Sequence, residues 1–162
     1  MTTDGLRNGT PAPVVRPASA TDLPALQELA RRTIDSRYRP FLGDESVEGF
    51  IGSGASDDHI ESHFRQGHVH CMTAAGRIVG LAILEGPTID LIMIDVDRQR
   101  EGLGRVLLTE AEKMLFAEYD EIRLESFTSN HAAIAFYEAC GWSVKGPLES
   151  AGPERVELVR HR

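Results

Sequence analysis

The stretch RQREGLGR, residues 98–105, follows directly on the apolar run LIMI at 91–94. Three arginines and two glycines therefore fall where a strand is expected to end and a helix to begin. Glycines at such a junction let several backbone N–H groups point into one concavity, and the dipole of the following helix adds positive potential. The stretch predicts a site for an anionic phosphate, in a chain whose formal net charge is -8.

The common nucleotide-binding motifs do not fit this stretch. A dinucleotide fingerprint needs a third glycine after Gly102 and Gly104, and that glycine is absent. A P-loop needs Gly-Lys followed by Ser or Thr, which is absent too. The pattern that is present is Q/R-x-x-G-x-G/A, beginning at Gln99.

A second informative stretch is SNHAAIAFYEACGW, residues 129–142. Asn130 is a typical helix N-cap, and Gly141 is a typical residue just past a helix end. Asn130 and Tyr137 are seven residues apart, so they return to nearly the same helix face after two turns and can line one groove. Two simpler interpretations stay open, with Asn130 acting only as a cap and Tyr137 only as a half-buried core aromatic.

Together the two stretches resemble the sequence signatures of the GNAT superfamily of acetyl-CoA-dependent N-acetyltransferases. The resemblance includes the strand IDLIMI and covers most of residues 14–160. Val96 stands where a proline is frequent in the family, and Trp142 stands where Phe is more usual. The resemblance implies an α/β (α+β) fold, with a mixed, mostly antiparallel central sheet of about seven strands flanked by about four helices.

The family's activity is transfer of an acetyl group from acetyl-CoA directly to a primary amine of a small molecule or a peptide, in a ternary complex. The resemblance implies that Tyr137 protonates the departing thiolate. Main-chain groups of the strand would pair with pantetheine and polarise the thioester carbonyl. The residues expected to bind the cofactor are Ile92, Met93, Ile94, Gln99, Arg100, Glu101, Gly102, Leu103, Gly104, Arg105 and Asn130.

The attacking amine must be neutral, so a proton acceptor is needed. Strand alternation places Asp90 on the same face as Ile92 and Ile94, which makes Asp90 the first candidate for this catalytic role. Glu125 and Glu85 are alternatives. A solvated carboxylate at a strand end would explain any of the three equally well.

The wider chain of 162 residues predicts one domain over residues 14–162, preceded by a flexible tail at 1–13. Apolar periodicity predicts helices from residue 21, at 45–51, 57–66, 103–118 and 130–140. Strands are expected at 14–18, 68–73, 77–84, 89–94 and 122–127, with two more in WSVKG and PERVELVRH.

Composition limits the partners. With 17 Lys and Arg against 25 Asp and Glu, the chain is a poor candidate for binding nucleic acid or an anionic membrane, whereas a cationic amine would be attracted. Two cysteines and the absence of a signal-like N-terminus favour a reduced, cytoplasmic protein. A homodimer is compatible with the sequence, which does not specify the oligomeric state.

Two further patterns are expected to carry no chemistry. HIESH places His59 and His63 one helical turn apart, and HVH at 68–70 adds two imidazoles on a strand. We expect solvated or titrating histidines and no metal site, because the Glu of a zincin motif would directly follow the first His. Cys140 is expected to be a small core residue. A non-catalytic acyl-CoA-binding sensor or scaffold remains the alternative function.

Overall fold

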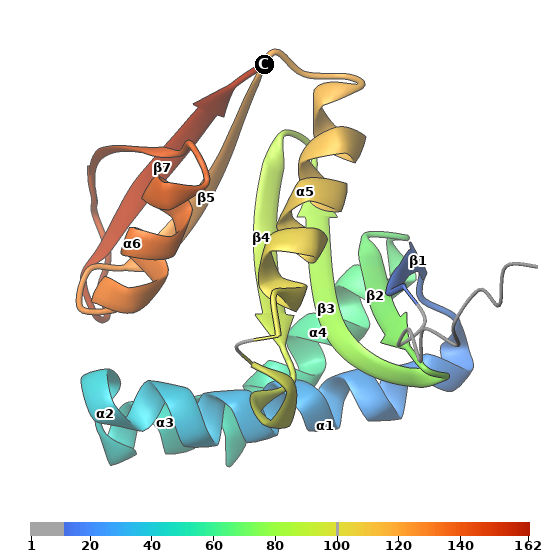
Figure 1. Ribbon diagram of the computed structural model, residues 1–162. Helices are drawn as coiled ribbons and strands as arrows, with labels where there is room; N and C mark the ends of the chain where they lie inside the picture. The colour runs from blue at the N-terminus through green and yellow to red at the C-terminus, as the bar shows by residue number, and fades with distance from the viewer. Residues whose placement is uncertain (1–11, 100) are drawn as a thin grey trace, which may run out of the picture.

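The computed structural model describes residues 12–99 and 101–162, and within them seven strands form one mixed sheet in the order β1-β2-β3-β4-β5-β7-β6 (Figure 1). Only the β4–β5 pairing is parallel; the five other pairings are antiparallel. The predicted fold class is confirmed. The strands are β1 (Val14–Pro17), β2 (Val69–Ala74), β3 (Arg77–Glu85), β4 (Thr88–Ile94), β5 (Glu121–Phe127), β6 (Ser143–Leu148) and β7 (Arg155–His161).

Six α-helices lie in the described residues, and five of them match the ranges expected from the sequence; the sixth is a short helix after the first. A π-helical turn over Ile34–Tyr38 leads into a single-turn helix, in which Pro40 occupies the first turn, where a missing N–H costs little. Gly43, with φ of 83°, ends that helix. The helices are α1 (Leu23–Thr33), α2 (Arg39–Leu42), α3 (Asp44–Ile51), α4 (Ala55–Arg65), α5 (Leu103–Phe116) and α6 (His131–Ala139).

The core lies in two layers, one on each face of the sheet. Helix α5 packs Leu107, Leu108 and Ala111 against one face, as its apolar periodicity predicts. On the other face, α1 and α4 bury Leu26 and Ile60 against the strands. Figure 1 shows α5 in front of β3 and β4, with α4 behind them.

The decisive irregularity is the separation of β4 from β5. These parallel strands pair only at Thr88 with Arg123 and at Ile89 with Leu124, and then diverge (Figure 1). On its other edge β4 stays paired with β3 as far as Ile94. The sheet is therefore opened between its two halves, and the polar backbone edge of β4 is exposed in the opening.

A second irregularity lies beside the first. Along the β3–β4 ladder, Ile83 pairs with Leu91 but Leu84 pairs with Ile89, so Asp90 is an extra residue in β4. Such a bulge locally changes the direction in which side chains point.

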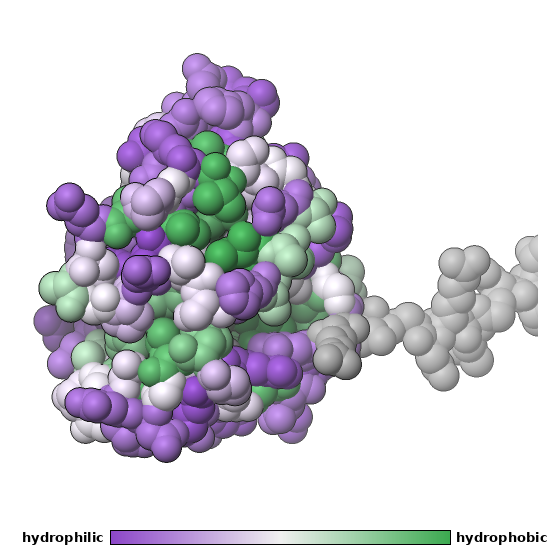
Figure 2. All heavy atoms as spheres, turned by 90° about the vertical axis from the view of Figure 1, so that its left-hand side faces the viewer, coloured by the Kyte–Doolittle hydropathy of each residue, from purple (hydrophilic) through white to green (hydrophobic). Residues whose placement is uncertain are grey.

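The face shown in Figure 2 carries hydrophobic areas within a hydrophilic surround. Figure 2 shows the side of the molecule that carries α6 and β7 above and α2 below, and hydrophobic atoms gather there in an upper and a lower area surrounded by hydrophilic ones. None of the described helices combines the length and apolarity that a membrane span requires. The predicted tail lies largely outside the described residues.

Candidate active site

A pocket of about 1030 Å³ lies where β4 and β5 separate. Its wall combines segments distant in sequence: α4, β4, the glycine loop, β5 and α6. Most of the predicted site residues share this wall, namely Asp90, Ile92, Met93, Ile94, Gln99, Gly102, Gly104, Arg105, Asn130 and Tyr137. Leu103 is instead buried beneath the loop, at 8% exposure, and Arg100 lies outside the described residues.

The glycine loop forms the N-terminus of α5. Gly102 has φ of 77° and is the N-cap residue, a conformation that a residue with a side chain adopts at a cost. Gly104 lies in the first turn, where an added Cβ would stand 3.6 Å from Phe136 Cζ of α6 and 3.8 Å from Ile94 Cγ1. The loop thus presents the free N–H groups and positive dipole end of a 14-residue helix to the pocket.

The charges of this loop are partly balanced within it. Arg98 Nε donates to Glu101 Oε2 at 2.7 Å, so these two side chains form an ion pair. Arg105 follows on the helix and lines the pocket. Gln99 Nε2 donates to the Ile94 carbonyl at 3.2 Å and ties the loop to the end of β4.

The exposed edge of β4 offers a specific set of backbone groups. Asp95 donates its N–H to the Val79 carbonyl of β3 at 2.9 Å. Because successive residues direct their N–H and C=O groups to opposite edges, Met93 also faces β3, whereas Ile92 and Ile94 face the opening toward β5. Of the three residues whose main-chain groups were expected to pair with pantetheine, Ile92 and Ile94 therefore direct those groups into the opening, and Met93 does not.

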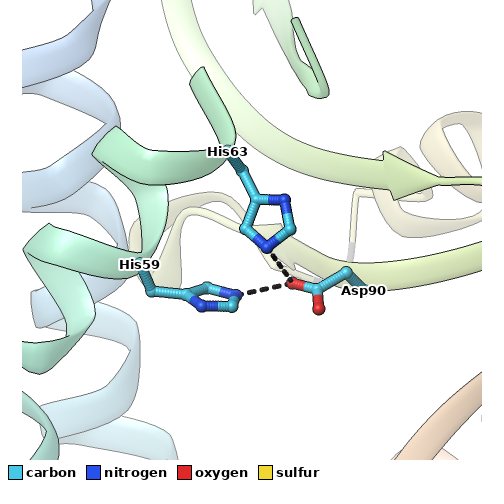
Figure 3. A group of neighbouring side chains, drawn as sticks. All are labelled: His59, His63 and Asp90. Carbon is cyan, nitrogen blue, oxygen red and sulfur yellow. Dashed lines mark hydrogen bonds and ion pairs between the residues drawn. The ribbon is translucent and has the colours of Figure 1, made fainter. Parts of the chain in front are cut away.

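Asp90 does not share a face with Ile92 and Ile94, so that prediction is wrong. Ile92 and Ile94 pack on the α5 side, but the bulge lets Asp90 reach α4, where His59 Nε2 lies 2.6 Å from Asp90 Oδ2 (Figure 3). Burial raises the pKa of Asp90, but the hydrogen bond with His59 and the neighbouring imidazoles outweigh it, and the net pKa is lowered. The same hydrogen bond raises the pKa of His59.

The alternative carboxylates lie in different surroundings. Glu125 of β5 lines the pocket and accepts from Arg155 Nη1 at 2.9 Å. Glu85 ends β3 and lies beside His63 and His68, away from the pocket wall. Asp90 is therefore the candidate carboxylate in the wall with an imidazole partner.

Asn130 and Tyr137 share the pocket-facing side of α6, as the sequence predicts. Asn130 Oδ1 accepts from the Ala133 N–H at 3.2 Å, so the capping interpretation is also confirmed. Tyr137 packs its ring near Phe136 and Trp142, with centroid distances of 5.5 and 6.2 Å. Burial raises the pKa of Tyr137, which keeps the phenol protonated at neutral pH.

An aromatic group in the pocket was not predicted as part of the site. The ring centroid of Tyr38 lies 5.3 Å from that of Phe41 and 5.9 Å from that of Phe127. The ring centroids of Phe50 and Phe127 are 6.3 Å apart. Burial raises the pKa of Tyr38 to about 12. The sequence signal for this group is the aromatic content of residues 37–67, which does not report where these side chains lie in the fold.

The histidines of HIESH are not all solvated. His63 is only 8% exposed, and its Nδ1 lies 3.0 Å from His68 Nδ1. Ligand atoms of His59, His63 and Asp90 lie within 4.8 Å of one another, as do those of His63, His68 and Glu85. Of the two expectations, solvated or titrating histidines, the solvated one is therefore wrong for His63. Cys140 is partly buried and packs against the core, as predicted.

Comparisons with known proteins agree with this geometry. An [Ribosomal protein bS18]-alanine N-acetyltransferase from Escherichia coli K12 is 40% identical over 80 residues, 44% of this chain and 52% of the relative. The chain thus spans about half the length of the curated relatives it matches.

Two solved structures share the fold. A GCN5-related N-acetyltransferase from Rhodopseudomonas palustris superposes with a TM-score of 0.83 at 17% identity, covering 95% of this chain and 98% of that one. The PaiA N-acetyltransferase from Thermoplasma acidophilum, in complex with coenzyme A, gives 0.77 at 19% identity, covering 93% and 99%. Residues 38–152, most of the chain, match the family described as Acetyltransferase (GNAT) domain. The chain belongs to the GNAT acetyltransferase family.

Proposed function

We propose that this protein transfers the acetyl group of acetyl-CoA directly to a primary amine while both substrates are bound. The observation that carries the proposal is the opening between β4 and β5, because one pocket there brings together a helix N-terminus, an exposed strand edge, a partly buried phenol and a carboxylate.

The N-terminus of α5 is the proposed pyrophosphate site. Its free N–H groups and dipole favour an anion, and Arg105 adds a positive charge at the same wall. The backbone edge of Ile92 and Ile94 would pair with the amide groups of pantetheine, as an added strand does at a sheet edge. Residues 99 and 101–105, together with Asn130, form the rest of the proposed cofactor contact.

The proposed chemistry needs two proton transfers. The amine nitrogen attacks the thioester carbon, and a strand N–H stabilises the negative charge on the carbonyl oxygen. The C–S bond then breaks, and the sulfur takes a proton from the Tyr137 hydroxyl. The nitrogen gives up a proton to the Asp90 carboxylate, which is hydrogen-bonded to His59.

The proposed acceptor is a peptide with a free N-terminal amine. The curated relative is named for alanine acetylation on a ribosomal protein, which makes this class the first to assay. The net charge of -8 favours a cationic acceptor, whether that acceptor is a peptide or a small molecule. A small-molecule amine is the competing acceptor.

The test is product formation followed by mass spectrometry, which avoids thiol reagents that would also react with the partly exposed Cys140. The panel contains an Ala-initiated peptide, the same peptide with its N-terminus blocked, and a polyamine. We expect amine-dependent acetylation of one free amine and none of the blocked peptide. Acetyl-CoA binding without acetylation of any member would instead support the non-catalytic binding module.

A further inference from the structure

Three polar side chains form a compact group at the α4 side of the pocket (Figure 3). His59 and His63 lie one turn apart on α4 with ring centroids 4.6 Å apart, and both point toward Asp90 of β4. Asp90 Oδ2 lies 2.6 Å from His59 Nε2 and 3.9 Å from His63 Nε2. The two imidazoles and the carboxylate thus converge on one point.

These separations suit a shared metal ion. Zinc binds imidazole nitrogen and carboxylate oxygen at about 2.0–2.2 Å, which places ligand atoms of a tetrahedral ion about 3.3 Å apart. The separations of the two Nε2 atoms from Asp90 Oδ2, 2.6 and 3.9 Å, lie on either side of that value. Small side-chain rotations are therefore enough to admit an ion in place of the His59–Asp90 hydrogen bond.

The surroundings supply the outer contact that a metal-binding imidazole needs. His63 Nδ1 lies 3.0 Å from His68 Nδ1, which fixes the His63 ring while its Nε2 faces Asp90. Ligand histidines usually use their second nitrogen in this way, and the contact orients the ring. His68 is itself close to Glu85.

We propose that His59, His63 and Asp90 form a binding site for one divalent transition-metal ion of the zinc type at the edge of the pocket. Two imidazoles and one carboxylate favour Zn²⁺, Ni²⁺ or Cu²⁺ over Mg²⁺ and Ca²⁺, which prefer oxygen ligands. Sequence alone did not predict this site because its third ligand comes from β4, 31 residues from His59.

The ion would act as an inhibitor of transfer. It would occupy the Asp90 carboxylate, and His59 and Asp90 both line the pocket into which the amine must enter. The transfer steps proposed above use no metal. This consequence rests on the proposed function, whereas metal binding itself does not.

Binding is tested by calorimetric titration of Zn²⁺ into the full chain without a polyhistidine tag. We expect one ion per chain, with affinity lowered at least ~10-fold in His59→Gln and in Asp90→Asn. Both side chains are partly exposed, so the variants are expected to fold, which circular dichroism checks. The matched control is His161→Gln, an exposed histidine on β7 that should retain the affinity.

The proposal is overturned if His59→Gln and Asp90→Asn bind Zn²⁺ as tightly as the parent, or if His161→Gln loses the same affinity. Equal affinity for Mg²⁺ would also contradict it. Inhibition is a separate measurement: Zn²⁺ should lower turnover of the parent and of His161→Gln, EDTA should reverse this, and EDTA alone should not reduce turnover. One bound ion without inhibition would leave the metal site intact and contradict the proposed role of Asp90.

Discussion

Ile89 of β4 and Leu124 of β5 form the last pair of the parallel ladder, and beyond them the two strands separate. The separation leaves Ile92 and Ile94 with backbone groups directed into the pocket, next to the N-terminus of α5. A ligand that pairs with a strand edge and ends in a phosphate matches both features.

Substitution of Gly104 tests the proposed cofactor loop. A Cβ alone is tolerated, because its nearest neighbours would be at 3.6 and 3.8 Å, an ordinary contact distance. The two methyl groups of Val would extend beyond it, toward the pocket wall and Phe136. We expect Gly104→Val to weaken acetyl-CoA binding at least ~10-fold, or about 1.4 kcal/mol, in a calorimetric titration.

The matched control is Gly104→Ala, which adds only the tolerated Cβ and replaces glycine by a better helix former. Its melting temperature should not fall. Unchanged acetyl-CoA affinity in Gly104→Val would remove the loop from the cofactor site. Gly104→Val acts by filling space near the pocket and not by straining the backbone, because the residue with positive φ in the loop is Gly102.

Local patterns were sufficient to predict most of the fold. The run LIMI packs alternate residues on the two faces of the sheet, and the periodic leucines of 103–118 bury one helix face, so in each case the spacing reports the structure directly. The mixed, mostly antiparallel sheet of about seven strands came from the family resemblance, whereas the strand order and the parallel β4–β5 pairing were not predicted.

The parts of the site that depend on tertiary contacts were not predictable. Strict alternation gave the wrong face for Asp90 because a bulge depends on pairing with β3, which the strand's own sequence does not specify. The spacing in HIESH does not report the partner of His59, because Asp90 comes from another element. The aromatic group around Tyr38 likewise joins α2, α3 and β5.

The departure from the family pattern at Trp142 predicts a stabilising polar contact. Trp142 is buried, and its Nε1 donates to Glu112 Oε1 at 2.8 Å. Glu112 also accepts from Arg160 Nη1 at 2.9 Å. Glu112→Ala leaves both donors without this carboxylate and should lower the free energy of unfolding by about 3 kcal/mol, measured by urea denaturation.

The control for this contact is a double-mutant cycle with Trp142→Phe, which removes the indole N–H and keeps an aromatic ring. Trp142→Phe alone should cost about 1–2 kcal/mol. The double variant no longer contains the indole N–H that Glu112→Ala leaves without a partner. Its loss in free energy of unfolding should therefore be smaller than the sum of the two single losses. Strict additivity would show that the contact contributes nothing to stability.

The contacts of Asp22 predict how the free energy of unfolding changes as the pH is lowered. Arg16 Nη1 donates to Asp22 Oδ2 at 2.7 Å and the Ser19 N–H donates to the same oxygen at 2.7 Å, and these contacts hold the pKa of Asp22 well below its usual range. The folded state therefore binds this proton less readily than the unfolded state, so the stabilisation is complete above about pH 5 and declines as the pH falls below ~4.

We expect Asp22→Asn to lose about 2 kcal/mol of unfolding free energy at pH 7, and the difference from the parent to shrink toward pH 2. Urea denaturation at a series of pH values measures this difference. A gap that is the same at pH 3 and pH 7 would contradict the role of the ionised carboxylate.

Tyr137→Phe distinguishes the catalytic role of this residue from a packing role. The substitution keeps the ring against Phe136 and Trp142 and removes the hydroxyl that the proposed mechanism uses. Melting temperature and acetyl-CoA affinity should therefore change little. Loss of a general acid typically lowers the rate ~100-fold or more, and the loss should appear in kcat more than in KM.

The most direct test of the account is the kcat of Tyr137→Phe for an accepted amine, measured under conditions where chemistry limits turnover. The account predicts a kcat reduced ~100-fold or more, with a folded protein that still binds acetyl-CoA. Turnover at the parent rate, or a lowered melting temperature with nearly normal turnover, would contradict it.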